Sequence, residues 1–67
     1  MKISINGNVK QFENENMTIS ALMLTLNLTG KRLAIEKNGE IVPRSQFADV
    51  QLQDGDVLEI VGAVGGG

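Results

Sequence analysis

The chain contains no cysteine and no histidine, and these two absences exclude several kinds of chemistry. Without cysteine there is no disulfide framework and no thiol nucleophile. Without histidine the chain lacks the usual general base and the commonest metal ligand of proteins. A chain of 67 residues also leaves no room for a deep catalytic cleft beside a hydrophobic core. We therefore expect no catalytic residues, no bound metal, and a protein that is not itself an enzyme.

Other residue types and patterns are also scarce, and their scarcity limits the kinds of partner that the chain could bind. Phe12 and Phe47 are the only aromatic residues, so stacking on nucleic-acid bases has almost no platform. The net charge is −2, whereas a nucleic-acid-binding domain would carry a clustered basic face. No segment approaches the roughly 18 apolar residues that span a bilayer, and Met1 leads into an alternating pattern rather than a signal peptide. These features predict one cytoplasmic domain that binds neither nucleic acid nor membrane.

The first half of the chain predicts a hairpin followed by a helix. Ile3 and Ile5 alternate with polar residues, and Asn6-Gly7 separates them from a second short segment, residues 9–12. Asn-Gly at such a place predicts a hairpin, because a type I′ turn needs positive φ at both central positions. Thr18 suits a helix N-cap. After it, apolar residues recur at the spacing of one helical face, at Ile19, Leu22, Met23 and Leu26.

This helix is expected to end at Gly30, with Asn27 as a second candidate stop. The alternation then resumes in residues 32–37, with Leu33 and Ile35 facing inward. Asn38-Gly39 predicts a second tight turn, and residues 40–42 predict a short strand that Pro43 closes.

The last third of the chain predicts a helical turn, a polar turn and a final strand. Residues 45–48 fit a single helical turn, and Asp54-Gly55-Asp56 is interpreted as a turn rather than a metal site. On the last strand, residues 57–61, Leu58 and Ile60 share one face. The other face carries Val57, Glu59 and Val61. This second face is a candidate partner surface, although ordinary exposed strand residues would look the same.

The order of these elements predicts the fold. A single helix cannot cover both faces of a sheet, so it should pack on one of them. The first and last strands are both strongly apolar, so we expect them to be central and to pair in parallel. The prediction is an α+β fold of the ubiquitin-like β-grasp type, with a mixed sheet of four or five strands and one helix on one face. Residues 1–62 would form this domain, and residues 63–67 a flexible glycine-rich tail.

The sequence closes with Gly65, Gly66 and Gly67. At average glycine usage, three specified glycines arise by chance roughly 3 times in 10,000. A backbone without Cβ atoms can thread a narrow cleft and adopt φ values closed to other residues. Its one reactive group would be the α-carboxylate of Gly67. A plain flexible linker is the alternative.

Several motifs together resemble one known family. They are Asn38-Gly39-Glu40-Ile41-Val42-Pro43-Arg44, Leu52-Gln53-Asp54-Gly55-Asp56, Glu59-Ile60-Val61 and Val64-Gly65-Gly66-Gly67. They resemble the ThiS family, the sulfur carrier proteins of thiazole (thiamin) biosynthesis, and the likeness covers essentially the whole chain. What the resemblance implies is a carrier cycle that involves several partner enzymes.

In that cycle, an adenylyltransferase related to ubiquitin activators uses ATP and Mg²⁺ to adenylate the Gly67 carboxylate. Sulfur from a cysteine desulfurase then displaces AMP to give a thiocarboxylate, and thiazole synthase accepts this sulfur. The carrier would bind no cofactor of its own, and Gly65, Gly66 and Gly67 would thread into the partner sites.

Two other functions stay open at this point. A sulfur carrier of the molybdopterin-synthase type, or a ubiquitin-like protein modifier, would use the same tail. The short length and the segment from Asn38 to Arg44 favour the thiamin pathway. A function of another class is a noncatalytic interaction module whose glycine tail is only a linker.

Overall fold

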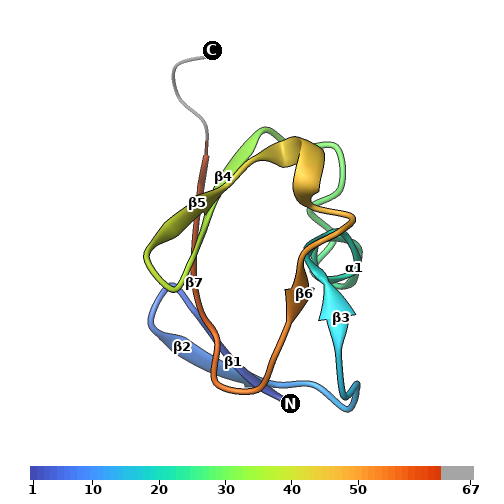
Figure 1. Cartoon of the computed structure of the whole chain (residues 1–67), viewed down its shortest axis with the longest axis vertical. Helices are drawn as coiled ribbons and strands as arrows, with labels where there is room; N and C mark the ends of the chain where they lie inside the picture. The colour runs from blue at the N-terminus through green and yellow to red at the C-terminus, as the bar shows by residue number, and fades with distance from the viewer. Residues whose placement is uncertain (63–67) are drawn as a thin grey trace.

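The computed structural model describes residues 1–62 of the chain (Figure 1). It contains one α-helix, one short 3₁₀ turn and seven strands among these residues. In chain order the elements are β1 (Lys2–Ile5), β2 (Asn8–Gln11), β3 (Met17–Thr18), α1 (Ile19–Thr25), β4 (Leu33–Lys37), β5 (Glu40–Val42), η1 (Arg44–Gln46), β6 (Gln51–Leu52) and β7 (Val57–Gly62).

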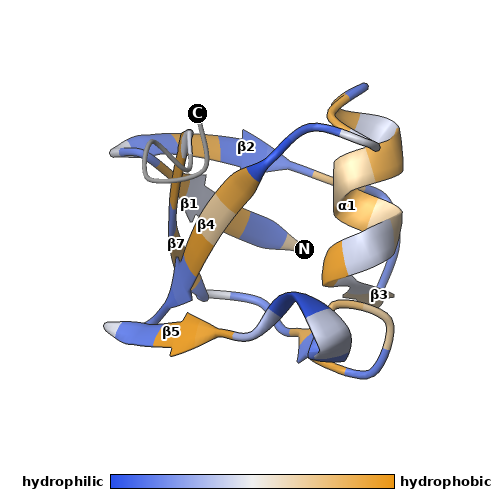
Figure 2. Cartoon of the chain, turned by 90° about the horizontal axis from the view of Figure 1, so that it is seen from above, coloured by the Kyte–Doolittle hydropathy of each residue, from blue (hydrophilic) through white to orange (hydrophobic). Residues whose placement is uncertain are grey.

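Five of the strands form one mixed sheet in the order β2-β1-β7-β4-β5. The first and last strands pair in parallel at its centre, with Ser4 opposite Val57 and Ile5 opposite Leu58. All other pairs in this sheet are antiparallel. Figure 2 shows the sheet curving around the side of the molecule that carries α1. The predicted ubiquitin-like β-grasp fold, with a parallel central pair, is therefore confirmed.

The core lies between the helix and the concave face of the sheet. Most of its buried side chains come from alternate positions of β1, β4 and β7 and from one face of α1, as the two periodicities predicted, and β3 and β6 add one each. The buried side chains are Ile3, Ile5, Met17, Ile19, Leu22, Met23, Ile35, Leu52, Leu58 and Ile60.

Both Asn-Gly turns are confirmed, and the side chain of each asparagine also forms hydrogen bonds to β7. Asn6 and Asn38 adopt φ values of 50° and 53°, and the glycines that follow them also have positive φ. The Asn6 side chain donates from Nδ2 to the Ile60 carbonyl oxygen at 2.9 Å and accepts from the Ile60 amide at 2.7 Å. The Asn38 Oδ1 atom accepts from the Val57 amide at 2.9 Å. Both turns are thus fastened to β7 from opposite sides, which the sequence did not predict.

The helix begins as predicted but ends earlier. Thr18 caps it, since its Oγ1 atom accepts from the Ala21 amide at 3.1 Å. The expected end at Gly30 is wrong, because α1 stops at Thr25 and Asn27 adopts a φ of 60°. The Asn27 amide donates to the Leu24 carbonyl at 3.1 Å, and the Leu28 amide donates to the Met23 carbonyl at 2.8 Å. This pair of bonds is a Schellman motif, which an asparagine in the left-handed region can close without glycine.

Two further local features differ from the sequence prediction. A separate two-stranded sheet joins β3 to β6, with Met17 opposite Leu52 and Thr18 opposite Gln51. The predicted helical turn at residues 45–48 is η1, which begins one residue earlier, at Arg44.

Candidate functional site

β7 is the strand from which the chain continues into the glycine-rich tail. It lies between β1 and β4, so backbone partners hold it on both sides, and Gly62 pairs with Leu33 at its end. Residues 63–67, and with them Gly65, Gly66 and Gly67, lie outside the described residues. The roles predicted for these glycines stay predictions, as does the division of the chain into a domain and a tail. Of the candidate site, the structure therefore describes β7, the strand that precedes these residues.

The facing of β7 follows the prediction. Leu58 and Ile60 are buried on the concave side, with 0% and 8% of their surfaces exposed. Val57 and Val61 point to the opposite side, with 48% and 57% exposed, and Glu59 between them is exposed as well. The structure thus brings the three predicted surface residues into one row, which ends where the described chain ends.

Neighbouring strands extend this row into a wider surface. The register places Ala34 opposite Val61 and Glu36 opposite Glu59, and it places Ile41 of β5 opposite Glu36. Ile41 is 74% exposed. We call this surface the outer face, and it consists of Ala34, Glu36, Ile41, Val57, Glu59 and Val61.

The chemistry of the outer face suits binding rather than catalysis. It combines apolar side chains with two carboxylates that stand directly opposite each other on neighbouring antiparallel strands. Like charges in such a pair repel and destabilise the sheet slightly. A cationic group on a partner would relieve that repulsion, while apolar partner atoms would cover the valines and Ile41. Sequence reasoning found the β7 residues but missed Ala34, Glu36 and Ile41, because register is needed to place them beside β7.

The aspartates near β7 have structural roles, as the turn interpretation predicted. Gly55 has a φ of 92°, and Asp54 accepts from the Lys2 amide at 2.6 Å through Oδ1. The buried carboxylate of Asp56 accepts from the Gln53 amide at 2.8 Å and from Asn38 Nδ2 at 3.0 Å. Within residues 1–62, no three carboxylate, histidine or cysteine side chains gather as a metal site would need. In the same range, no helix has the length and apolar character that crossing a bilayer requires.

Comparison with known proteins identifies the family. The sequence pattern of the ThiS family matches residues 3–67, which is almost the whole chain. The chain belongs to the ThiS family. The resemblance inferred from the motifs between Asn38 and Gly67 is therefore confirmed.

Individual relatives agree with the ThiS assignment. The chain is 35% identical to the sulfur carrier protein ThiS of Bacillus subtilis, over 97% of this chain and 98% of that protein. Its structure matches the crystal structure of the thiamine biosynthesis protein ThiS from Geobacter metallireducens with a TM-score of 0.89. That match covers 100% of both chains, at 28% sequence identity.

Another ThiS-like relative is much longer. The chain is 46% identical, over its full length, to part of a thiazole synthase from Paramagnetospirillum magneticum. It spans only 20% of that protein. A stretch that makes up a fifth of that thiazole synthase therefore resembles this chain.

Proposed function

We propose that this chain is a sulfur carrier of thiamine biosynthesis that carries sulfur as a thiocarboxylate on Gly67. The observation that supports it most strongly is the ThiS family match, which runs from residue 3 through the three terminal glycines. The B. subtilis relative, matched over nearly its whole length, is named a sulfur carrier protein. The G. metallireducens structure is that of a thiamine biosynthesis protein.

The proposed chemistry begins at an unreactive carboxylate. A terminal carboxyl group has a pKa of about 3.3 to 3.7, so at neutral pH it is ionised and a poor electrophile. An adenylyltransferase would use ATP and Mg²⁺ to turn it into an acyl-adenylate, with loss of pyrophosphate. A cysteine desulfurase would supply sulfur as a persulfide, whose attack displaces AMP and leaves an acyl disulfide. A thiol reductant would then cleave the disulfide bond and release the thiocarboxylate. ATP and Mg²⁺ belong to the adenylyltransferase in this scheme, and the carrier itself holds neither.

The body of the carrier contributes position rather than reactivity. The five residues after Gly62 span roughly 16 to 18 Å when fully extended. That length would bring the carboxylate of Gly67 to a buried site while the β-grasp domain stays outside. Gly66 and Gly67 would be the strictest positions, because a side chain there would collide with the walls of a narrow channel. The outer face, beside the base of the tail, is proposed to dock on the adenylyltransferase.

Thiazole synthase is the proposed acceptor of the sulfur. The long relative in P. magneticum supports this partner, because a stretch of that thiazole synthase resembles this chain. We place the cycle in the cytoplasm, where ATP for the activation step is made and used.

Intact mass spectrometry tests the proposal. The chain is incubated with the adenylyltransferase from its own organism, MgATP, a desulfurase system that supplies sulfur, and a thiol reductant. Its mass should increase by the difference between one sulfur and one oxygen atom. The matched control lacks Gly67 and should keep its mass, while its circular dichroism spectrum matches that of the parent. Normal thiocarboxylate formation in the control would refute the assignment of Gly67.

Two measurements in cells complete the test. Deletion of the gene should cause a thiamin requirement that the thiazole moiety relieves, whereas a molybdopterin carrier would leave thiamin synthesis intact. The peptide isolated from the end of the cellular protein should finish at Gly67. Further residues after Gly67 in the working protein would contradict the proposed thiocarboxylate.

A further inference from the structure

A hollow opens on the helix side of the sheet, away from the outer face. Its volume is about 280 Å³. Four apolar side chains line it, namely Met23, Leu28, Leu33 and Phe47, and Lys31 and Arg44 line it as well. Met23 is buried, the other three apolar residues are partly buried, and the two cations are exposed. We call this feature the basic hollow.

The walls of the basic hollow are tied together by hydrogen bonds. The Schellman motif at the end of α1 holds Leu28 in place through the Met23 carbonyl. At the other wall, the Phe47 carbonyl accepts from the Ser20 amide at 2.9 Å, which fixes the end of η1 against the start of α1. The Arg44 Nη2 atom donates to the Lys31 carbonyl at 3.4 Å, so that the two walls are linked. The hollow is therefore largely formed before any partner arrives.

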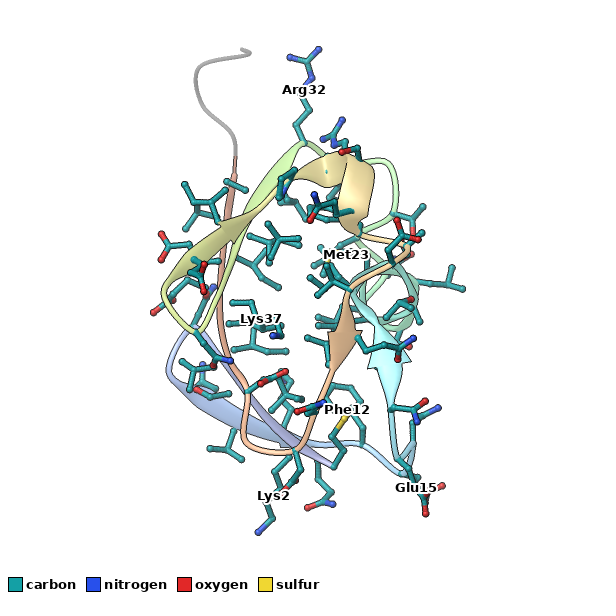
Figure 3. The ribbon with its side chains drawn as sticks, viewed as in Figure 1. Lys2, Phe12, Glu15, Met23, Arg32 and Lys37 are labelled. Carbon is teal, nitrogen blue, oxygen red and sulfur yellow. The ribbon has the colours of Figure 1, made fainter. Side chains whose placement is uncertain are left out.

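Charge distinguishes this end of the molecule from the rest of the chain. The residues that line the hollow include two cations and no carboxylate, although the chain as a whole has a net charge of −2. Arg32 follows Lys31 directly, and Figure 3 shows it projecting from this end of the molecule, whereas Lys2 and Glu15 lie at the opposite end. A partner surface that carries carboxylates would be attracted to this end and would orient the carrier.

The hollow lies close to the end of β7, where the glycine-rich segment begins. Leu33, one of its lining residues, pairs with Gly62 at the end of β7. A partner that draws in the residues after Gly62 would therefore bring its own surface close to the hollow. The chemistry at Gly67 would lie as much as roughly 16 to 18 Å further on, within an enclosed site. The cations would then meet protein side chains at the entrance of that site rather than the reacting groups.

We propose that the basic hollow is a docking site for thiazole synthase. The occupant would be a surface segment with an apolar side chain that enters the hollow and neighbouring carboxylates that pair with Lys31 and Arg44. A volume of about 280 Å³ lies just below the roughly 300 to 1,000 Å³ of small-molecule pockets, so it fits an anchoring side chain better than a whole ligand. This inference rests on the proposed function, and it assigns thiazole synthase a surface separate from the outer face.

Binding measurements with two matched double variants test the proposal. In the first, Lys31→Gln and Arg44→Gln remove two cations from the hollow. In the control, Lys2→Gln and Lys10→Gln remove two exposed cations from β1 and β2, so that both variants have the same net charge. The dissociation constant for thiazole synthase from the same organism is measured by calorimetry at low and at physiological salt.

The hollow variant should bind roughly 2- to 30-fold more weakly than the parent, as expected for the loss of two exposed ion pairs. Its binding should also depend less on salt, because fewer charges attract the partner. The control should bind like the parent. A single Lys31→Gln variant, which keeps the Arg44 bond to the Lys31 backbone, should lose part of the affinity. Thermal melts of all variants show whether a loss of binding reflects a loss of folding.

Nuclear magnetic resonance gives a readout that does not depend on mutation. Addition of thiazole synthase should change the methyl chemical shifts of Met23, Leu28 and Leu33 in the parent, and leave those of the exposed Val9 on β2 unchanged. Equal affinities of the two double variants, or unchanged signals at the hollow, would overturn the docking site while leaving the carrier function intact. A weaker interaction with the adenylyltransferase alone would show that the assigned partner is wrong. Failure of the parent to bind thiazole synthase at all would instead count against the proposed function itself.

Discussion

Two asparagines, Asn6 and Asn38, each combine a positive φ with side-chain hydrogen bonds to β7. The positive φ was predictable, because Asn-Gly is the preferred pair for a type I′ turn. The hydrogen bonds were not, since Asn6 and Ile60 are 54 positions apart and nothing local indicates that they meet. Asn6 extends the pairing of β1 with β7, because its side-chain amide makes the bonds to Ile60 that the backbone of a further strand residue would otherwise make.

Substitutions at Asn6 separate these two roles. Asn6→Gly removes the side-chain bonds without strain, and should lower the free energy of unfolding by about 1 to 2 kcal/mol. Asn6→Ala also removes these bonds, and it should cost about 1 to 2 kcal/mol more than Asn6→Gly, because alanine keeps a Cβ atom at positive φ without the polar side chain that lets asparagine adopt this region. Urea denaturation followed by circular dichroism measures both values. An Asn6→Gly variant as stable as the parent would show that the bonds to Ile60 contribute nothing.

The elements that were predicted correctly are those whose signals are local. Strand alternation identified the buried faces of β1, β4 and β7, and Thr18 marked the start of α1. The helix end was misplaced because both Asn27 and Gly30 can adopt positive φ, and both do. The choice between them depends on the core, where the face formed by Ile19, Leu22 and Met23 is already complete before Asn27. β3 and β6 were missed because two residues cannot show a period.

The Schellman motif predicts how the end of α1 responds to mutation. Asn27→Ala should cost about 1 to 2 kcal/mol of unfolding free energy, because alanine is strained at a φ of 60°. Asn27→Gly should be neutral or slightly stabilising, since glycine is the usual residue at this position. Asn27 is exposed, so neither change disturbs the core. Equal stabilities of the two variants in urea would contradict the motif.

The facing of β7 gives a second prediction for a single element. Leu58→Ala should cost about 2 to 5 kcal/mol, because it leaves a cavity in the core. Val57→Ala, one residue away on the outer face, should change stability by no more than about 0.5 kcal/mol. Guanidinium or urea titration compares the two. A Leu58→Ala variant as stable as the parent would mean that the described facing of the strand is wrong.

Across the whole molecule, β7 separates two surfaces of different character. The outer face carries exposed valines and the opposed pair Glu36 and Glu59, and the basic hollow on the helix side carries Lys31 and Arg44. The outer-face residues of β7 were predictable from alternation alone. The hollow was not, because its lining comes from α1, the following turn, β4 and η1, which only the tertiary fold brings together. Under the proposed function, two surfaces beside the end of β7 would let the carrier present the same terminus to two enzymes in turn.

If one of these surfaces docks on a partner, the number of residues between β7 and Gly67 sets how far the terminal carboxylate can reach into the partner. If the body docks at the entrance of a partner site, it cannot move closer to make up for a shorter tail. Deletion of Ala63 shortens the reach by roughly 3.3 to 3.6 Å and keeps all three terminal glycines. We expect kcat/KM for adenylation to fall by about 100-fold or more, because misplacement of the reacting atom by about 1 Å can already cost that much.

The matched control is Ala63→Gly, which keeps the length of the tail and should be adenylated at nearly the parental rate. Pyrophosphate release with the adenylyltransferase from the same organism measures all three proteins, and urea denaturation should show equal stability for each. A slow deletion variant beside a fast Ala63→Gly variant would mean that the partner senses tail length rather than the side chain at this position. Equal rates for the deletion and the parent would mean that the body does not dock in a fixed place. In that case the outer face would lose its proposed role in activation.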